Sequence, residues 1–421
     1  MFSTLRRVWP LLLGMVFLMI SNGLLVTLLT LRGYALGFDN TDIGIMQSAF
    51  PIGSIISCWL TPRLILRVGH IRVFAALASL ASTGALVHLI TDSVLAWSAM
   101  RLLVGFCYAG LYVVAESWLN GMADNRSRGT ILSSYFVIQA GGMALGQLFL
   151  FGSNPEGIVL FIVISILISL SLIPILIAVT ASPQIHRPAL LGLRELFKLS
   201  PMGVTGSFLN GIVQSALYVG LGLYGAGRGL SASQTGTLVA AVTVGGMLLQ
   251  FPIGRLSDTI DRRRVIVGSS AAAVPICALL ILQPTASTGL GWTFGLIAIL
   301  GGLCLPIYSL CLAHTNDYLT PEEIVPAGST LIMVFYIGLI IGPTLVAMFV
   351  DRLGSAGLFY CVLVVQVLIT LTGLFRLITG QDRAEEPGVA LAYSASSTTG
   401  ASRLNPDAEQ HSAAPEDRPV P

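Results

Sequence analysis

The chain has few charged residues. Asp, Glu, Lys and Arg together make up 10% of its 421 residues, whereas hydrophobic residues make up 54%. A soluble domain carries roughly 25% charged residues, so this composition excludes an ordinary soluble protein and indicates a chain that is solvated mainly by lipid. The net charge of +2 is too small to indicate a nucleic-acid partner.

The chain also lacks the usual marks of a disulfide framework, a metal site or an enzyme. Its six cysteines lie in apolar stretches, without paired spacing or histidines at zinc-ligand spacing, and are expected to be small buried hydrophobic residues: Cys58, Cys107, Cys277, Cys304, Cys311 and Cys361. No nucleotide-binding motif and no nucleophile with its base is present. The sequence therefore predicts no cofactor, no metal, no catalytic residue and no direct use of ATP.

Long apolar segments are abundant instead. A bilayer core requires about 20 apolar residues per helix, and twelve segments meet this requirement. They lie at 9–31, 43–64, 73–90, 95–119, 131–151, 158–179, 204–224, 236–256, 265–282, 292–312, 329–350 and 358–378. Polar and apolar residues do not alternate along these segments, as they would along the strands of a barrel in lipid. We therefore predict an all-α membrane protein with twelve transmembrane helices.

The chain repeats itself across its two halves. With a constant shift of 192 positions, Gly37, Gly44, Gly53 and Arg72 return as Gly229, Gly236, Gly245 and Arg264. A repeat of this length indicates two copies of a membrane half-protein. We expect two pseudo-symmetric six-helix bundles at 1–180 and 204–378, a cytoplasmic linker with a short surface helix at 181–203, and a disordered cytoplasmic tail at 379–421.

Basic residues indicate the orientation. If the N-terminus is cytoplasmic, the inner loops hold fourteen basic residues and the outer loops only Arg32, Arg228 and Arg352. Basic residues concentrate on the cytoplasmic side of membrane proteins. The sequence therefore predicts a multi-pass protein of the inner (plasma) membrane with both termini in the cytoplasm.

One loop carries a motif that resembles a known family. The stretch Gly254-Arg-Leu-Ser-Asp258, followed by Arg262-Arg263-Arg264, is similar to the loop signature of the major facilitator superfamily. The first-half copy keeps Arg67, Gly69 and Arg72 but has Pro62 and Leu66 where the signature has Gly and Asp.

Further matches extend the resemblance over residues 9–378. Arg101-Leu-Leu-Val-Gly105 is similar to the family's fourth-helix arginine motif, and Val114-Ala-Glu116-Ser and Ala313-His314-Thr-Asn316-Asp317 resemble more narrowly its uncharacterised YcaD-type branch. The resemblance implies the major facilitator fold and transport of a small molecule, without naming the substrate.

The signature residues predict a cytoplasmic gate. A carboxylate such as Asp258 can accept the free N–H groups at the N-terminus of a neighbouring helix. The family resemblance implies that such contacts stabilise the outward-open state. The alternative is an acidic loop residue beside arginines that set the topology, and for His314 a structural role is an alternative. The gate candidates are Arg67, Arg72, Arg128, Asp258, Arg262, Arg263, His314 and Asp317.

Polar side chains within the apolar segments predict a central cavity. On a helix at 100° per residue, Arg101, Tyr108, Tyr112 and Glu116 fall on one face, which should line an aqueous cavity between the halves. Interhelical hydrogen bonding is the alternative for single polar positions. The other substrate or coupling candidates are Gln139, Asn210, Gln214, Tyr218 and Tyr308, and Tyr135, Asn22, Gln47 and Gln250 are further polar positions.

The two charged positions in the fourth segment have separate interpretations, because they lie about 22 Å apart at 1.5 Å per residue. Arg101 can bind an anionic substrate or favour deprotonation of a nearby acid, or it can be a structural cation bonded to helix carbonyls. Glu116 is the one carboxylate clearly inside a segment. It can form a gate salt bridge to Arg128 or Arg67, or carry protons.

Together these features predict a secondary transporter, not an enzyme, that works by alternating access. We expect a monomer in the lipid bilayer with a small-molecule substrate and coupling to protons. Efflux of amphipathic compounds and uptake of a polar metabolite both fit the sequence. The alternative function is a membrane receptor or scaffold that signals through its tail, which truncation after Gly380 would abolish.

Overall fold

The structure is a computed structural model that describes residues 2–122, 128–177, 191–283 and 290–379. The predicted tail beyond Thr379 and residues 181–190 of the predicted linker lie outside the described residues. The first half contains α1 (Phe2–Ala35), α2 (Asn40–Val68), α3 (His70–Val87), α4 (Val94–Met122), α5 (Arg128–Gly146), the 3-10 helix η1 (Gln147–Leu150), α6 (Val159–Leu170) and α7 (Leu172–Ile177). The second contains α8 (Leu193–Leu199), α9 (Pro201–Gly227), α10 (Ala232–Thr259), α11 (Arg262–Leu282), α12 (Leu290–Cys304), α13 (Ile307–Asn316), α14 (Pro321–Leu353), η2 (Gly354–Ala356) and α15 (Gly357–Thr379).

These helices make twelve membrane crossings, which confirms the predicted fold class. Nine stretches of the described chain are long and apolar enough to span a membrane, and one of them, Pro326–Thr379, contains both α14 and α15. Helix α9 and the shorter apolar stretch Val137–Leu150 complete the twelve.

Two crossings predicted as single helices are broken. The tenth is divided into α12 and α13 at Leu305 and Pro306, and the sixth into α6 and α7 at Ser171. Proline has no N–H to continue a helical ladder, which accounts for the first break. The second part of the tenth crossing runs to Asn316, four residues beyond the predicted boundary.

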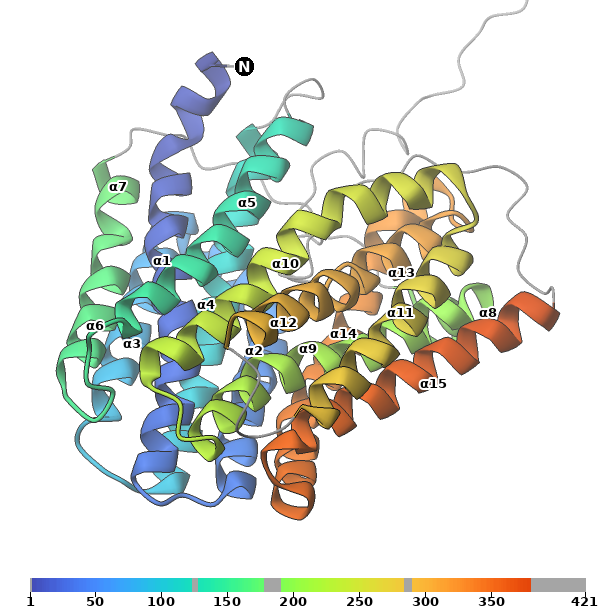
Figure 1. The fold of residues 1–421 in the computed structure, drawn as a ribbon. Coiled ribbons are helices and arrows are strands. Elements are labelled where there is room, and N and C mark those ends of the chain that lie inside the picture. Colours follow the sequence, from blue (N-terminus) through green and yellow to red (C-terminus); the bar gives the residue numbers. More distant parts are fainter. Residues whose placement is uncertain (1, 123–127, 178–190, 284–289, 380–421) are drawn as a thin grey trace, which may run out of the picture.

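The two bundles have equivalent packing, as the repeat predicts. Within α1–α7, α2 packs on α4, α1 on α5, and α3 on α6; within α9–α15, α10 packs on α12, α9 on α14, and α11 on α15 (Figure 1). The core of each bundle is apolar, with fully buried side chains such as Phe74 and Phe161 in the first and Phe359 in the second.

The repeated glycines have matching structural roles. Gly37 and Gly229 adopt positive φ angles of 79° and 66° in the turns that follow α1 and α9, where a side chain would be strained. Gly53 lies against the Leu102 carbonyl of α4, and Gly245 lies in the equivalent place against the Ala298 carbonyl of α12. A Cβ at either position would overlap the carbonyl oxygen, so both glycines set the close approach of two helices.

The molecule has two ends that differ in charge. The basic end is where α1 begins and α2 and α10 end; the opposite end is where α1 and α9 end and α2 and α10 begin. The basic end carries most of the arginines and is the end predicted to be cytoplasmic. Helix α8 lies at this end, where Leu196 packs with Val204, Leu312 and Leu331.

Candidate functional site

A cavity lies between the two bundles near the middle of the crossing helices. Its volume is about 250 Å³, and residues of α1, α2, α4 and α5 line one side and residues of α9, α10, the α12–α13 region and α14 the other. The polar lining residues are Asn22, Gln47, Arg101, Tyr112, Gln139, Gln214, Ser215, Tyr218, Thr243, Gln250, Ser309 and Tyr336. None of the described residues that line the cavity is a carboxylate.

The structure brings many of the sequence-predicted residues into this lining. They are Arg101, Tyr112, Gln139, Gln214 and Tyr218 among the site candidates, together with Asn22, Gln47 and Gln250. Four polar lining residues were not predicted from the sequence, namely Ser215, Thr243, Ser309 and Tyr336. Thr243 and Gln250 are seven residues apart, which places them on one helical face, so this spacing could have identified Thr243.

Other predicted residues are buried beside the cavity rather than in its lining. Asn210 donates to the Cys304 carbonyl at 2.8 Å, and the Tyr308 ring packs 4.6 Å from the Phe335 ring. These contacts connect helices within the C-terminal bundle, and that of Asn210 is the interhelical hydrogen bonding given as the alternative for single polar positions.

The polar face of α4 is hydrogen-bonded to α1. The Tyr108 hydroxyl lies 2.7 Å from the Ser21 hydroxyl, and Asn22 Nδ2 donates to the Tyr112 hydroxyl at 3.0 Å. Tyr108 is fully buried, whereas Tyr112 reaches the cavity. The predicted stripe therefore has a structural part and a cavity-facing part.

Arg101 is the one charged residue among the described residues that line the cavity. Its side chain is only 2% exposed, and its guanidinium carbon lies 4.6 Å from the centre of the Phe50 ring. Buried Nε and Nη1 have no hydrogen-bond partner in the described part of the chain. The bonds to helix carbonyls that a structural cation would make are therefore not seen there. An unpaired buried charge costs several kcal/mol, so this arrangement is energetically expensive for the protein alone.

Glu116 is the only described Asp or Glu that is fully buried, at 3% exposure. The Tyr135 hydroxyl of α5 donates to its Oε1 at 3.0 Å. Arg67, one predicted salt-bridge partner, is exposed at the end of α2 and forms no ion pair within the described chain, and Arg72 is exposed as well. The side chain of Arg128, the other predicted partner, lies outside the described residues.

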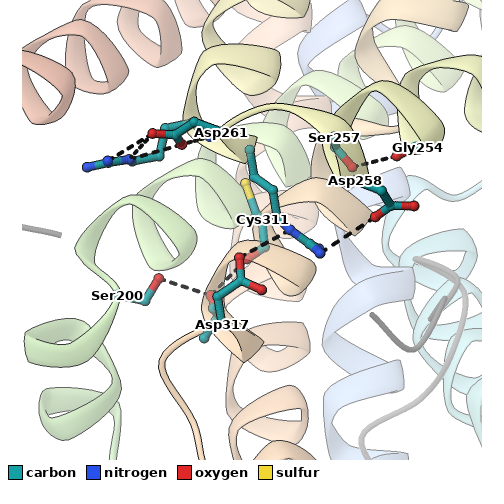
Figure 2. Close-up of polar contacts among 10 residues, drawn as sticks. Ser200, Gly254, Ser257, Asp258, Asp261, Cys311 and Asp317 are labelled. Carbon is teal, nitrogen blue, oxygen red and sulfur yellow. Dashed lines mark hydrogen bonds and ion pairs between the residues drawn. The ribbon is translucent and has the colours of Figure 1, made fainter. Parts of the chain in front are cut away.

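At the basic end, one arginine joins two of the predicted gate carboxylates. Arg262 lies 3.6 Å from Asp258, one turn earlier in sequence, and its Nε lies 3.1 Å from Oδ2 of Asp317, which follows α13. Figure 2 shows Asp258 and Asp317 on either side of the guanidinium that both carboxylates contact. Asp258 is 60% exposed and its ion pair is within its own bundle, so it does not cap a helix of the other bundle in this conformation.

A second ion pair at the basic end joins Asp261 and Arg263. Asp261 caps the N-terminus of α11 by accepting from the Arg263 backbone N–H and also pairs with the Arg263 guanidinium at 2.9 Å. Partial burial alone would raise the pKa of Asp261, but the hydrogen bonds from Arg263 outweigh it and the pKa is lowered. His314 is buried, with its ring 5.2 Å from the Tyr318 ring.

The two bundles are joined at the opposite end, through residues that were not predicted from the sequence. The Asp351 carboxylate at the end of α14 accepts hydrogen bonds from Asn40 Nδ2 and Thr41 Oγ1, both at 2.8 Å, in the first turn of α2. Ser48 and Thr344 lie 3.1 Å apart between the same two helices. No sequence pattern points to these pairs, because they join helices from different halves.

Comparisons with known proteins agree with this architecture. The family model described as "Major Facilitator Superfamily" matches residues 11–234 and 203–399. The chain is 26% identical over 368 residues to the "Uncharacterized MFS-type transporter YcaD" of Escherichia fergusonii, and the match covers 87% of this chain and 94% of that one. The protein of the same description from Escherichia coli O45:K1 is 24% identical with the same coverage.

Solved structures show the same fold at lower identity. The nucleoside transporter NupG superimposes with a TM-score of 0.72 at 14% identity, covering 90% of this chain and 99% of that chain. A bacterial homolog to the human lysosomal transporter Spinster, in an inward-facing and occupied conformation, gives a TM-score of 0.69 at 15% identity, covering 90% and 98%. The predicted family is therefore confirmed, and this chain belongs to the major facilitator superfamily of multi-pass membrane transporters.

Proposed function

We propose that this protein is a secondary active transporter that moves a small polar molecule across the inner membrane by alternating access. The observation that carries the proposal is the central cavity, which both bundles line with polar side chains. Transporters built from two repeats place their substrate at the repeat interface near the bilayer midplane. A volume of about 250 Å³ lies just below the range of about 300–1,000 Å³ for ligand pockets, which favours a substrate the size of a small metabolite.

The arrangement of the bundles supports an inward-facing state. They contact one another at the opposite end through Asp351 and Thr344, and α5 and α10 diverge toward the end at which the chain begins (Figure 1). With the basic end in the cytoplasm, as the distribution of arginines predicts, the cavity would open inward. The exposure of Asp258 fits this state, because its proposed partner bundle has moved away.

We further propose that transport is coupled to protons through Glu116. A carboxylate in the membrane is costly and marks a functional position, and Glu116 lies one helical turn from Tyr112, which lines the cavity. Its hydrogen bond from Tyr135 connects α4 to α5. Protonation there would therefore change a contact between two helices that both line the cavity.

A transport assay tests the proposal. Purified protein is first screened for small polar metabolites that raise its melting temperature, since ligands stabilise the folded state to which they bind. The stabilising compounds are then tested for uptake into proteoliposomes with and without an imposed pH gradient. We expect accumulation that depends on the gradient and falls at least tenfold in the double variant Gln139→Ala/Gln214→Ala, which removes one cavity amide from each bundle.

The outcomes separate the parts of the proposal. Gln283→Ala, which changes an amide that does not line the cavity, should transport as the wild type does. Uptake that ignores the pH gradient would contradict proton coupling and leave alternating access standing. If compounds bind but none exchanges across the membrane, the protein is not a transporter, and the tail-signalling receptor becomes the better hypothesis.

A further inference from the structure

Arg101 occupies a position that the protein itself leaves incomplete. The guanidinium is buried in the cavity wall, Nε and Nη1 have no partner within the described chain, and none of the described lining residues is a carboxylate. The Phe50 ring lies 4.6 Å from the guanidinium carbon. An aromatic ring over a guanidinium interacts with its face, so Phe50 does not occupy the N–H groups at the edge of the guanidinium.

Two more buried atoms in the same lining lack a partner. The amide nitrogen of Asn22 donates to Tyr112, and that of Gln47 donates to the Val26 carbonyl and to Thr30. The carbonyl oxygens of both side chains, Asn22 Oδ1 and Gln47 Oε1, are buried without a hydrogen-bond donor in the described chain. Arg101, Asn22 and Gln47 all line the same cavity, so their unpaired atoms are candidate contacts for a ligand bound there.

We infer that the transported molecule is a small organic monocarboxylate that also carries hydrogen-bond donors such as hydroxyl groups. This inference rests on the proposed transport function. The carboxylate would accept two parallel hydrogen bonds from Arg101, a geometry that guanidinium favours. The donors would bind Asn22 Oδ1 and Gln47 Oε1. The described lining offers a single positive charge, so a single negative charge neutralises it, whereas a phosphate monoester would bring a charge of about −1.5 to −2.

The test compares matched ligands on matched variants of the full-length protein in detergent. The probes are hydroxylated monocarboxylates of increasing length, the primary amide of each and the phosphate ester of the corresponding alcohol, and the readout is the melting temperature as a function of ligand concentration. We expect carboxylates to stabilise the wild type and their amides not to do so. Arg101→Gln should weaken carboxylate binding roughly 10- to 100-fold, as expected for loss of hydrogen bonds to a charged group, and Arg101→Lys should weaken it less.

Two controls keep the result interpretable. Without ligand, Arg101→Gln should melt at a higher temperature than the wild type, because it removes an unpaired buried charge; this shows that the variant is folded. Arg228→Gln changes an arginine that also lies over an aromatic ring, Tyr224 at 5.2 Å, but does not line the cavity, and it should bind carboxylates as the wild type does.

The inference is overturned if amides stabilise the wild type as well as carboxylates do, if only phosphate esters stabilise it, if no carboxylate stabilises it, or if Arg101→Gln retains wild-type affinity. These results differ from a failure of the proposed function. If neutral compounds bind and undergo counterflow, the transport function is supported and the inference of an anionic substrate is rejected. If carboxylates bind through Arg101 but never exchange across the membrane, the carboxylate site is supported and the transport function is rejected.

Discussion

At the scale of single residues, Glu116 decides between two mechanisms. It is the one fully buried carboxylate of the described chain, and Tyr135 donates to it. A gate salt bridge would require a basic partner; Arg67 is exposed without an ion pair there, and the side chain of Arg128 lies outside the described residues. Proton carriage requires a group that can be neutral in one conformation and charged in the other, which a carboxyl next to a hydroxyl donor can be.

Glu116→Gln should abolish accumulation driven by a pH gradient and leave exchange at equal pH within about twofold of the wild type. The amide keeps the shape of the side chain but cannot carry a proton between the two sides. The measurement is uptake of an identified substrate into proteoliposomes in both modes. Glu195→Gln, which alters an exposed carboxylate in α8, serves as the control. Equal loss of both modes would instead assign Glu116 to the gate.

Helical periodicity identified which residues share a face, but not what that face contacts. It placed Arg101 and Tyr112 on one face of α4, and both residues line the cavity. It could not separate Gln214, in the lining, from Asn210, which bonds to the Cys304 carbonyl. Asn210 meets a neighbouring helix, whereas Gln214 faces the cavity between the bundles. The partners of Asp351 were unpredictable for the same reason, since Asn40 and Thr41 are more than 300 positions away.

At the scale of helices, two of the repeated glycines lie where neighbouring helices pack closely. Gly245 of α10 lies against the Ala298 carbonyl of α12, whereas Gly254, nine residues later in the same helix, has open space where a Cβ would be. The sequence showed that these glycines recur, and the structure supplies the physical reason: Gly53 and Gly245 are points at which two helices of each bundle approach closely. Pro306 before α13 and Pro174 at the start of α7 lie at the two breaks, so the sequence already carries a local cause for each of them.

Gly245→Ala should therefore destabilise the protein by about 1–3 kcal/mol, as expected when a methyl group is forced into a packed interface. Gly254→Ala should be neutral or stabilising, because alanine favours helix and meets nothing there. Thermal unfolding in detergent measures both. If the two substitutions lower the melting temperature equally, close helix approach does not explain the repeated glycine.

The contact between α2 and α14 is a second feature at this scale. Asp351 accepts two hydrogen bonds at the start of α2, where a negative charge is also favoured by the helix dipole. We expect these contacts to hold the opposite end closed and to break when that end opens. They do at this end what Asp258 was expected to do at the basic end.

Asp351→Ala should shift the conformational equilibrium toward opening at the opposite end. Two lost hydrogen bonds of about 1 kcal/mol each correspond to a change of roughly 30-fold. A cysteine at the buried position 48, introduced as Ser48→Cys, reports opening through its rate of labelling by a membrane-impermeant maleimide. Asp39→Ala, which alters a carboxylate with no cap bond at the start of α2, should not change the rate. Slower or unchanged labelling in Asp351→Ala would show that this contact is not a gate.

For the whole molecule, transport by alternating access requires two rigid bundles that rock about the cavity. The structure has the bundles in contact at the opposite end, and the sequence alone predicted the two bundles but not which end is closed. That limit is physical, because both conformations use the same helices and differ in contacts between the halves. The state can therefore be tested only by measuring both ends together.

The most direct measurement is a pair of distances between spin labels, one pair at each end. Arg63 and Arg255 are related by the repeat and exposed near the basic end, and Ala35 and Gly227 are their counterparts at the opposite end. Labels introduced at cysteines there report the separation of the bundles, since all six native cysteines are buried. When a substrate or a pH change shifts the equilibrium, alternating access predicts that the distance at the basic end shortens while the distance at the opposite end lengthens. Distances that stay fixed, or that change in the same direction at both ends, would contradict it.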